Sequence, residues 1–345
     1  MATKILICGH NLYGYLDAMA RGFIEAGADV AVYEHENTNV LKLHYRNWFK
    51  RKRAEFKINR INRCLRETVA TFRPDILLGI NGEVLLERTV AELSCSLHTV
   101  LWIVDAVANI KLPMSTIARF GKVYVFEPAD LTVVPGASYL AYGVDESCYQ
   151  SLADSEGPKE YDLSFVGSAH DNRLPILEEV ARFCAGAGFR FGVFGPFKPF
   201  AGFIRGRACR HRFPHLARAL VRNRKLTPAE VNEVYNISTI NLNIHHEQSV
   251  EGLNPRTFEI PAAGGFELVD FKPRLADYFR DGEDLVSYRD LTDLTEKIRY
   301  YLSNDRERSA IAAHGCRTAR TQHTFTSRCR RILEENTRQP RLPGA

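Results

Sequence analysis

The sequence predicts an α/β protein built from two parallel-sheet domains, and three observations support this class. The chain has 345 residues, enough for about two ordinary domains. Short apolar segments rich in Ile, Leu and Val alternate with longer amphipathic segments, as in parallel α/β layers. A turn-rich, acidic stretch at residues 154–158 interrupts this alternation, which then begins again. We therefore expect an interdomain linker near residues 151–160.

The first half begins with an apolar strand at Lys4–Cys8, followed by a glycine-bounded loop and a helix that ends near Ala26. Further strands are expected at Asp29–Tyr33, Asp75–Gly79, Thr99–Val104 and Lys122–Phe126. We assign residues 1–152 to a first Rossmann-like domain, because strands and helices alternate throughout it.

The second half repeats this pattern after the linker. Strands are expected at Tyr161–Val166, Arg190–Phe194, Thr239–Ile244 and Phe266–Val269. Helices are expected at Asn172–Ala187, Leu291–Leu302, Arg306–Ala319 and Thr326–Glu335. We assign residues 160–320 to a second Rossmann-like domain and residues 321–345 to a C-terminal helix and tail. Two such domains joined by one linker predict a cleft between them, where small ligands tend to bind.

The composition excludes several classes of protein. The chain is 45% hydrophobic and 25% charged, which is typical of a soluble globular protein. The longest uncharged run, Leu131–Val144, has 14 residues, whereas a membrane-spanning helix needs about 20. The N-terminus reads as a strand rather than a signal peptide, and no two of the eight cysteines form a Cys-x-x-Cys pair. These features predict a cytoplasmic protein with reduced thiols.

The strongest local motif contains two glutamates, Glu251 and Glu259, with seven residues between them. Asn254 is a candidate cap for a helix that carries Arg256 in its first turn. Free N–H groups at a helix start and an arginine fork both suit an anion such as a diphosphate. Glu259 could accept hydrogen bonds from ribose hydroxyls. An ordinary capped helix with a solvated Arg256 and Glu259 is the alternative.

This motif, followed by Ala-x-Gly-Gly at residues 262–265, resembles the donor site of retaining GT-B glycosyltransferases. The variant at residues 253–264 is more similar to the CgeB-like (spore maturation protein) glycosyltransferase family. Other matching segments are Tyr142–Asp145, Phe165–Ser168 with Arg173, Leu226–Glu230, Tyr235–Asn236 and Ile240–Asn243. The resemblance covers residues 120–290, while residues 1–120 agree in pattern only.

The resemblance implies the GT-B fold, in which two Rossmann-like domains face each other across a cleft and the C-terminal helix packs back on the N-domain. It implies a glycosyltransferase of the hexosyltransferase type that uses a nucleotide-diphosphate sugar and needs no separate cofactor. The donor would bind mainly to the second domain and the acceptor mainly to the first. The acceptor hydroxyl could belong to a protein, a glycan or a lipid-linked saccharide.

By position in the family motif, Glu259 would bind the ribose and Glu251 the donor sugar. The diphosphate would be neutralised by Arg173, Arg256 and Lys198. The donor-binding candidates are Gly167, Ser168, Arg173, Lys198, Tyr235, Asn243, Glu251, Asn254, Arg256 and Glu259. The chain departs from the family pattern at residues 252–254, where Gly-Leu-Asn replaces the Gly-Phe-Gly of many members.

The chain contains no Asp-x-Asp sequence, the pair with which metal-dependent GT-A enzymes hold Mn²⁺ or Mg²⁺ on the diphosphate. We therefore expect no metal site, and stabilisation of the leaving charge by arginines and helix N-termini. Activity should then persist in a chelator.

Three residues are candidates for acid–base catalysis because they follow predicted strands of the first domain, where α/β folds place functional groups. They are His10, Glu83 and Asp105. A solvated His10 in a tight turn and a capping Asp105 are the alternatives. An inverting enzyme needs such a base and a retaining enzyme does not, and the sequence leaves both open.

Two segments are strongly basic. Lys42–Arg66 contains ten Lys or Arg and one acid, and Arg190–Lys225 contains ten and no acid. The first also carries aromatic residues and could contact an anionic membrane at its cytoplasmic face, grip a phosphorylated acceptor, or lie solvated over the sheet. The second could rim the donor site. No RNA-binding motif is present, and we do not expect nucleic acid as a partner.

Two other functions remain open. A nucleotide-sugar 2-epimerase uses the same two-domain architecture but needs no acceptor. A non-catalytic protein that binds a polyanion or a membrane through the basic segments is the third reading.

Overall fold

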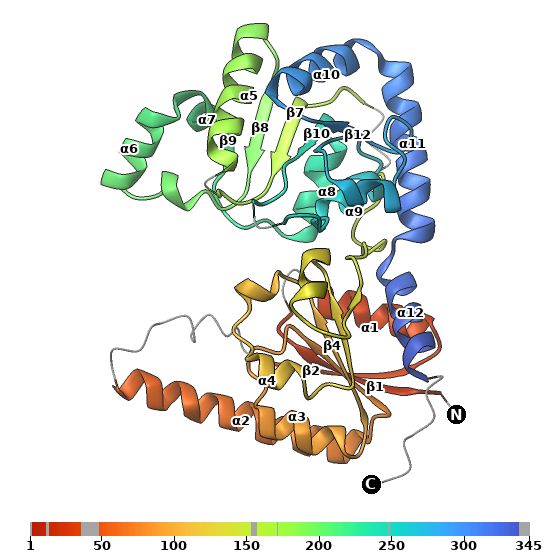
Figure 1. Cartoon of the computed structure of the whole chain (residues 1–345). Coiled ribbons are helices and arrows are strands. Elements are labelled where there is room, and N and C mark those ends of the chain that lie inside the picture. The colour runs from red at the N-terminus through yellow and green to blue at the C-terminus, as the bar shows by residue number, and fades with distance from the viewer. Residues whose placement is uncertain are drawn as a thin grey trace. The chain divides into compact units, whose positions relative to one another are not determined.

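The protein is described here by a computed structural model, which covers residues 2–11, 14–35, 48–152, 157–170, 172–247 and 249–337 (Figure 1). The chain divides into two compact units, Met1–Tyr142 with Phe325–Ala345 and Gly143–Thr324. Part of the first basic segment (residues 42–47) and part of the expected linker (residues 153–156) lie outside the described residues.

The first unit contains a six-stranded parallel sheet with the strand order β2-β1-β3-β4-β5-β6. Its strands are β1 (Lys4–Gly9), β2 (Asp29–Glu34), β3 (Ile76–Ile80), β4 (His98–Ile103), β5 (Lys122–Val125) and β6 (Ser138–Tyr139). Both faces of the sheet are covered, which explains why β1 and β3 are almost continuously apolar.

Helices cover the two faces of this sheet with separate apolar cores. Ile5, Ile7 and Trp102 pack on the side of α1 (Tyr15–Glu25) and α12 (Phe325–Thr337). Alternate residues such as Leu6 and Leu101 pack on the opposite side. The helices on that side are α2 (Trp48–Phe72), α3 (Glu87–Ser94) and α4 (Met114–Ile117).

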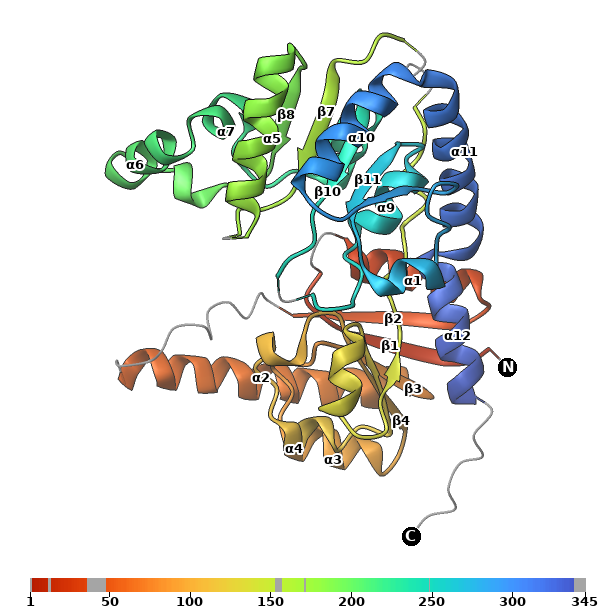
Figure 2. The ribbon, with the colours of Figure 1, turned by 45° about the horizontal axis from the view of Figure 1, so that its top comes forward.

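The last helix belongs to the first unit, as the expected return of the C-terminal helix to the N-domain requires (Figure 2). A Cβ atom on Gly22 of α1 would lie 3.0 Å from the backbone of Thr326, so this glycine permits the close approach of α12. At the far end of α12, the Tyr124 hydroxyl donates to Glu335 at 2.6 Å. The segment that looks like an appendage in the sequence is therefore part of the first core.

The second unit contains another six-stranded parallel sheet, with the order β12-β11-β10-β7-β8-β9. Its strands are β7 (Tyr161–Val166), β8 (Phe191–Phe194), β9 (Leu220–Arg222), β10 (Ser238–Asn243), β11 (Glu267–Asp270) and β12 (Val286–Tyr288). The short strands β6, β9 and β12 were not predicted. The predicted class, an α/β protein with two Rossmann-like units, is confirmed.

One large core on a face of this sheet joins α5 (Arg173–Ala187), α7 (Pro214–Ala219) and α10 (Leu291–Ser303). The unit also contains α6 (Ile204–Arg212), α8 (Pro228–Asn236), α9 (Arg256–Ala262) and α11 (Asp305–Gln322). Helix α8 begins with a capping box, in which Thr227 accepts from the Glu230 backbone and Glu230 accepts from that of Thr227.

Gly195 should be essential to the second unit because of its backbone conformation and its surroundings. Its φ is +127°, and a Cβ atom there would lie 2.0 Å from the carbonyl oxygen of Gly167. We predict that Gly195→Ala lowers the free energy of unfolding by about 2–4 kcal/mol. Gly186→Ala, in an open position of α5, should leave it unchanged or raise it by about 0.5–1 kcal/mol. Urea unfolding measures both, and equal losses would contradict this packing.

Candidate functional site

The candidate donor site of the second unit lies at the carboxyl ends of two paired central strands, β7 and β10. Gly167 and Ser168 follow β7, and Asn243 ends β10. A Cβ atom on Gly167 would lie 2.8 Å from the Phe165 ring and 3.3 Å from Nη1 of Arg256. Glycine at this position thus allows the arginine to lie against the loop after β7.

Two arginines meet at one carbonyl oxygen. Nε of Arg173 donates to the oxygen of Ile244 at 3.0 Å, and Nη2 of Arg256 donates to the same oxygen at 3.1 Å. Both guanidinium carbons lie 5.8 Å from the centre of the Phe165 ring. Arg173 begins α5 and Arg256 begins α9, so the two helix starts converge here.

Within the described part of the chain neither arginine forms an ion pair, and Asp270 is the acid whose charge acts on Arg173. Arg173 is only 3% exposed. Burial and the neighbouring Arg256 lower the pKa of Arg173 to about 8, so the charged form still prevails at pH 7. Two cations this close repel each other and one of them is buried, so a bound anion would relieve an electrostatic cost.

Asn243 holds Arg256 in place. This fully buried amide accepts from Nε of Arg256 at 3.0 Å and from Nδ2 of Asn254 at 2.8 Å. Its own Nδ2 donates to Glu267 at 2.7 Å. One side chain therefore connects β10, β11 and the start of α9, which fixes the direction of the arginine.

Asn254, the predicted cap of α9, makes a hydrogen bond to the start of this helix. Oδ1 of Asn254 accepts from the backbone N–H of Thr257 at 3.3 Å. The helix itself begins at Arg256, so Pro255 precedes its first residue. Below it, the buried His245 lies 2.7 Å from Asp270 and 3.4 Å from the Thr257 hydroxyl. These contacts fasten the helix start to β10 and β11.

Glu267 is a buried acid that sequence reasoning missed. Burial raises its pKa to about 8, so its carboxyl group is mostly protonated at pH 7. Oε1 accepts from Asn243, and Oε2 is buried without a hydrogen-bond partner among the described residues. The sequence signal that could have drawn attention to it is an acidic residue inside the predicted strand Phe266–Val269.

Glu259 is a residue of α9 that lies near two buried tyrosines, Tyr149 and Tyr235, and is itself 6% exposed. Burial is the main cause of the raised pKa of each tyrosine, and the negative charge of Glu259 is the second. The two tyrosine rings are 6.2 Å apart, and a hydrogen bond to Glu259 contributes to the raised pKa of each hydroxyl. Tyr149 was not predicted, because it stands next to the expected linker.

The other donor candidates are not all gathered at the arginine pair. Lys198 is exposed in the short helix Lys198–Phe200 after β8. Glu251 forms an ion pair with Arg274, whose Nε lies 3.2 Å from its Oε2. Ser168 lies closer, since its carbonyl oxygen accepts from Nη1 of Arg173 at 3.2 Å.

The three acid–base candidates of the first unit follow adjacent strands, β1, β3 and β4, at the same edge of the sheet. Nδ1 of His10 is buried and has no partner among the described residues. Glu83 accepts from the Lys111 backbone at 3.3 Å. Oδ1 of Asp105 accepts from the Ala106 backbone N–H at 2.8 Å and from Nδ2 of Asn109 at 2.9 Å.

Two further acids follow β5 at the same edge and were missed. Glu127 is 2% exposed and accepts from the Ala129 backbone. Asp130 accepts from the Val107 backbone at 2.8 Å. Burial, then the charges of Glu127 and Asp105, raise the pKa of Asp130, which indicates that these acids lie near one another.

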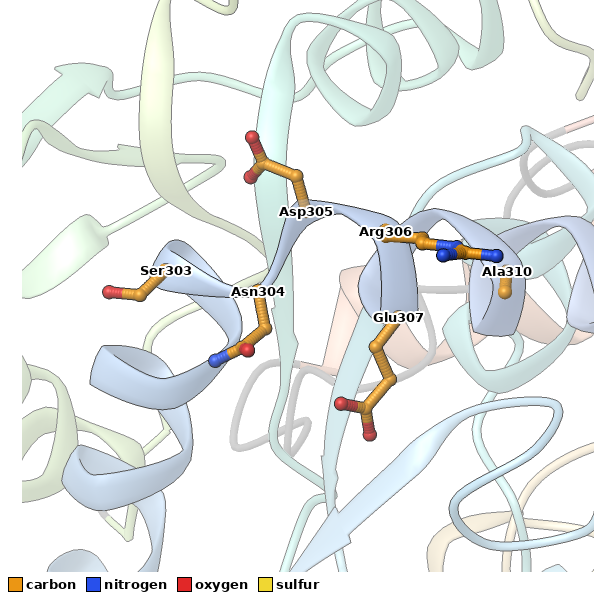
Figure 3. Close-up of a pocket in the computed structure, with 6 residues that line it drawn as sticks. All are labelled: Ser303, Asn304, Asp305, Arg306, Glu307 and Ala310. Carbon is orange, nitrogen blue, oxygen red and sulfur yellow. The ribbon is translucent and has the colours of Figure 1, made fainter.

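Figure 3 shows a surface hollow at the turn between α10 and α11, lined by Ser303, Asn304, Asp305, Arg306, Glu307 and Ala310. Asp305 pairs with Arg308 at 2.8 Å, and Glu307 accepts from the Tyr300 hydroxyl at 2.8 Å. None of the predicted site residues lines it. We therefore do not place the active site there.

Over the described ranges, no group of three or more His, Cys, Asp or Glu side chains could hold a metal ion. No helix in the part of the chain that the structure describes is long and apolar enough to cross a bilayer.

Comparison with known proteins agrees with this architecture. Residues 173–334 match the family model described as glycosyl transferase-like. The matched segment begins at Arg173 and includes the motif with Glu251 and Glu259. No curated protein sequence matches the chain significantly. The matched segment and the fold described next support a glycosyltransferase.

Solved structures share the fold over nearly the whole chain. Sucrose-phosphate synthase from Thermosynechococcus elongatus has a TM-score of 0.68 at 11% identity, with 97% of this chain and 98% of that chain covered. Anabaena HepE in complex with UDP-glucose has a TM-score of 0.65 at 10% identity, with 97% and 100% covered. A putative UDP-N-acetylglucosamine 2-epimerase from Listeria monocytogenes has a TM-score of 0.59 at 11% identity, with 96% and 95% covered. The chain therefore has the GT-B fold.

Glu267 should make stability depend on pH. Its pKa rises from 4.5 to about 8 on folding, so the wild type should lose stability as the pH rises through this window. We predict that Glu267→Gln removes this loss. The variant's advantage should grow by on the order of 1 kcal/mol per pH unit between about pH 5 and pH 8. Urea unfolding across this range measures it. The exposed Glu296→Gln should behave as the wild type, and parallel curves for all three proteins would contradict the buried protonated acid.

Proposed function

We propose that this protein is a metal-independent glycosyltransferase that moves a hexosyl group from a nucleotide-diphosphate sugar to an acceptor hydroxyl. The observation that carries the proposal is the convergence of Arg173 and Arg256 on the Ile244 carbonyl without an ion pair in the described chain. A diphosphate has the charge and the geometry to accept hydrogen bonds from both guanidinium groups.

In this proposal, the arginine pair stabilises the charge that develops on the departing diphosphate. The guanidinium groups are held by Ile244, Ser168 and Asn243 before the nucleotide sugar binds, so little reorganisation is needed during the reaction. Gly167 lets the guanidinium group of Arg256 lie against the loop after β7. Lys198, in the short helix after β8, would add a further positive charge.

Glu259 is the proposed ribose ligand, and Tyr149 and Tyr235 would orient its carboxylate. Glu251, held by Arg274, is the proposed contact to the sugar hydroxyls. Since HepE binds UDP-glucose in the structure that this chain resembles, uridine diphosphate is the first nucleotide to test. The finer relationship to the CgeB-like family is part of the proposal.

The acceptor is proposed to bind the first unit, at the edge that carries His10, Glu83 and Asp105. His10 is the preferred base, because its Nδ1 has no partner among the described residues, whereas one oxygen of Asp105 already accepts two hydrogen bonds. We propose a cytoplasmic enzyme whose basic segment Lys42–Arg66 approaches an anionic acceptor or the membrane. In this segment, Arg53 and Phe56 of α2 are exposed.

We predict that the enzyme turns over a nucleotide sugar in the presence of EDTA. Arg256→Ala and Glu259→Ala should each weaken donor affinity by roughly tenfold or more, because each removes a charge-assisted contact. Thermal shift with a series of nucleoside diphosphates and their sugars identifies the donor, and product formation measures turnover.

The matched controls for this test are Arg306→Ala and Glu296→Ala, which remove exposed charges of the same kind on α11 and α10. Both should retain wild-type affinity and turnover. Full donor affinity in the two site variants would refute the assignment of the site, and loss of activity in EDTA that added Mg²⁺ restores would refute metal independence.

A nucleotide-sugar 2-epimerase is the second candidate, because one structural neighbour is described as a putative enzyme of that class. The two reactions differ in their need for an acceptor. We predict that NMR of UDP-glucose or UDP-N-acetylglucosamine incubated with the enzyme alone shows no change of configuration at C2. Appearance of the 2-epimer without an acceptor would favour the epimerase instead.

A further inference from the structure

Helix α6 presents the most exposed large apolar side chains in the described part of the chain. Phe203, just before the helix, is 85% exposed and Ile204, its first residue, is 81% exposed, while the next in rank, Phe56, is 68% exposed. In Figures 1 and 2, α6 lies at the outer end of the second unit, beyond α7 and away from the sheet. Such exposure of two adjacent apolar residues is costly in water and calls for a partner.

The opposite face of α6 is firmly attached, so the exposed face has a fixed direction. Gly206 is buried, and a Cβ atom there would lie 2.7 Å from the carbonyl oxygen of Phe200. Nη2 of Arg210 donates to the same oxygen at 2.9 Å. Phe200 and Phe213, which flank the helix, belong to the core of the second unit.

The outward face of α6 carries a stripe between cations in which Ile204 is the large apolar residue. Ala208 and the imidazole of His211 continue this stripe, because they follow at spacings of four and then three residues on the same side of the helix. Three arginines flank this stripe, and all are exposed: Arg205, Arg207 and Arg212. Lys and Arg side chains that border an apolar stripe can extend their charge to phosphates while their stems cover apolar surface.

The three arginines of α6 belong to the part of the segment that forms no ion pair in the described chain. Arg190 pairs with Asp162, and Arg224 pairs with Glu230. Arg205, Arg207 and Arg212 form no ion pair with any described carboxylate, and residues 190–225 contain no acid at all. Arg205 and Arg207 stand next to the two exposed apolar side chains in the sequence, and Arg212 lies over the Phe213 ring at the end of the helix.

We infer that α6 with Phe203 is a docking surface for an anionic lipid bilayer. The arginines would contact lipid phosphates, and Phe203 and Ile204 would enter the interface between headgroups and acyl chains. Charge complementarity alone would also suit a nucleic acid, but phosphates give no reason for an exposed isoleucine beside the phenylalanine. This surface belongs to the nucleotide-binding unit, and it differs from the basic helix α2 of the first unit.

Cosedimentation of the full chain with lipid vesicles tests this inference. The wild type should bind vesicles of phosphatidylcholine with about one third phosphatidylglycerol, and bind pure phosphatidylcholine vesicles weakly. Arg205→Gln/Arg207→Gln/Arg212→Gln should weaken binding by about fivefold per arginine, which is on the order of a hundredfold in total. Phe203→Ser/Ile204→Ser should weaken it by at least about tenfold at unchanged charge.

Two control variants remove the same groups elsewhere. Arg306→Gln/Arg317→Gln/Arg330→Gln removes three charges without known ion pairs in the described chain, and Ile24→Ser/Val133→Ser removes two exposed apolar side chains. Both should bind anionic vesicles within about threefold of the wild type, because exposed charges far from the docking surface are screened by salt. All variants should show the wild-type thermal shift with nucleotide, which reports an intact second unit.

Three results would each overturn the inference. In the first, the wild type would not bind anionic vesicles, and in the second, the α6 variants would bind as well as their controls. In the third, the arginine variant would lose binding while Phe203→Ser/Ile204→Ser kept it, and a fluorescent oligonucleotide would be bound with the same dependence. That last pattern would identify a soluble polyanion as the partner of α6.

Discussion

The carbonyl oxygen of Ile244 organises the candidate site, because two guanidinium groups donate to it from different helices. The resulting juxtaposition of Arg173 and Arg256 is unfavourable in itself, since like charges repel and one of them is buried. The Phe165 ring faces both groups and partly offsets this repulsion. What remains is a fixed positive site whose electrostatic cost a diphosphate would remove.

This arrangement depends on residues that never touch the proposed ligand. Asn243 accepts from Arg256 and donates to Glu267, an acid that burial in β11 keeps mostly protonated at pH 7. Gly195 lets the loop after β8 pass the loop after β7 at a distance that a Cβ atom would forbid, and Gly167 lets Arg256 lie against its own loop. Stability and function are therefore coupled at this edge of the sheet, as is common where strain and unpaired charge serve a site.

The sequence was sufficient for the fold class and for the long central strands, because apolar strands are local patterns. It also singled out Arg173 and Arg256, which the structure brings together at one carbonyl oxygen, while their role toward a diphosphate stays a prediction. Strands β6, β9 and β12 have only two or three residues, too few for a periodic signal. Tyr149 and Glu267 were missed because their importance arises from burial beside residues distant in the chain. The ion pair of Glu251 with Arg274 spans 23 positions and has no signature in either segment. The residues of the first unit that would act on the acceptor remain proposals.

The most direct test of the arginine pair is calorimetric titration of the full chain with ADP, GDP and UDP and with the corresponding nucleosides. At least one diphosphate should bind with far higher affinity than its nucleoside, and Arg256→Gln should weaken that binding by roughly tenfold or more. Arg306→Gln should leave the affinity unchanged. Equal affinity for nucleoside and diphosphate, or an unchanged affinity in Arg256→Gln, would contradict the view that the two arginines form an anion site.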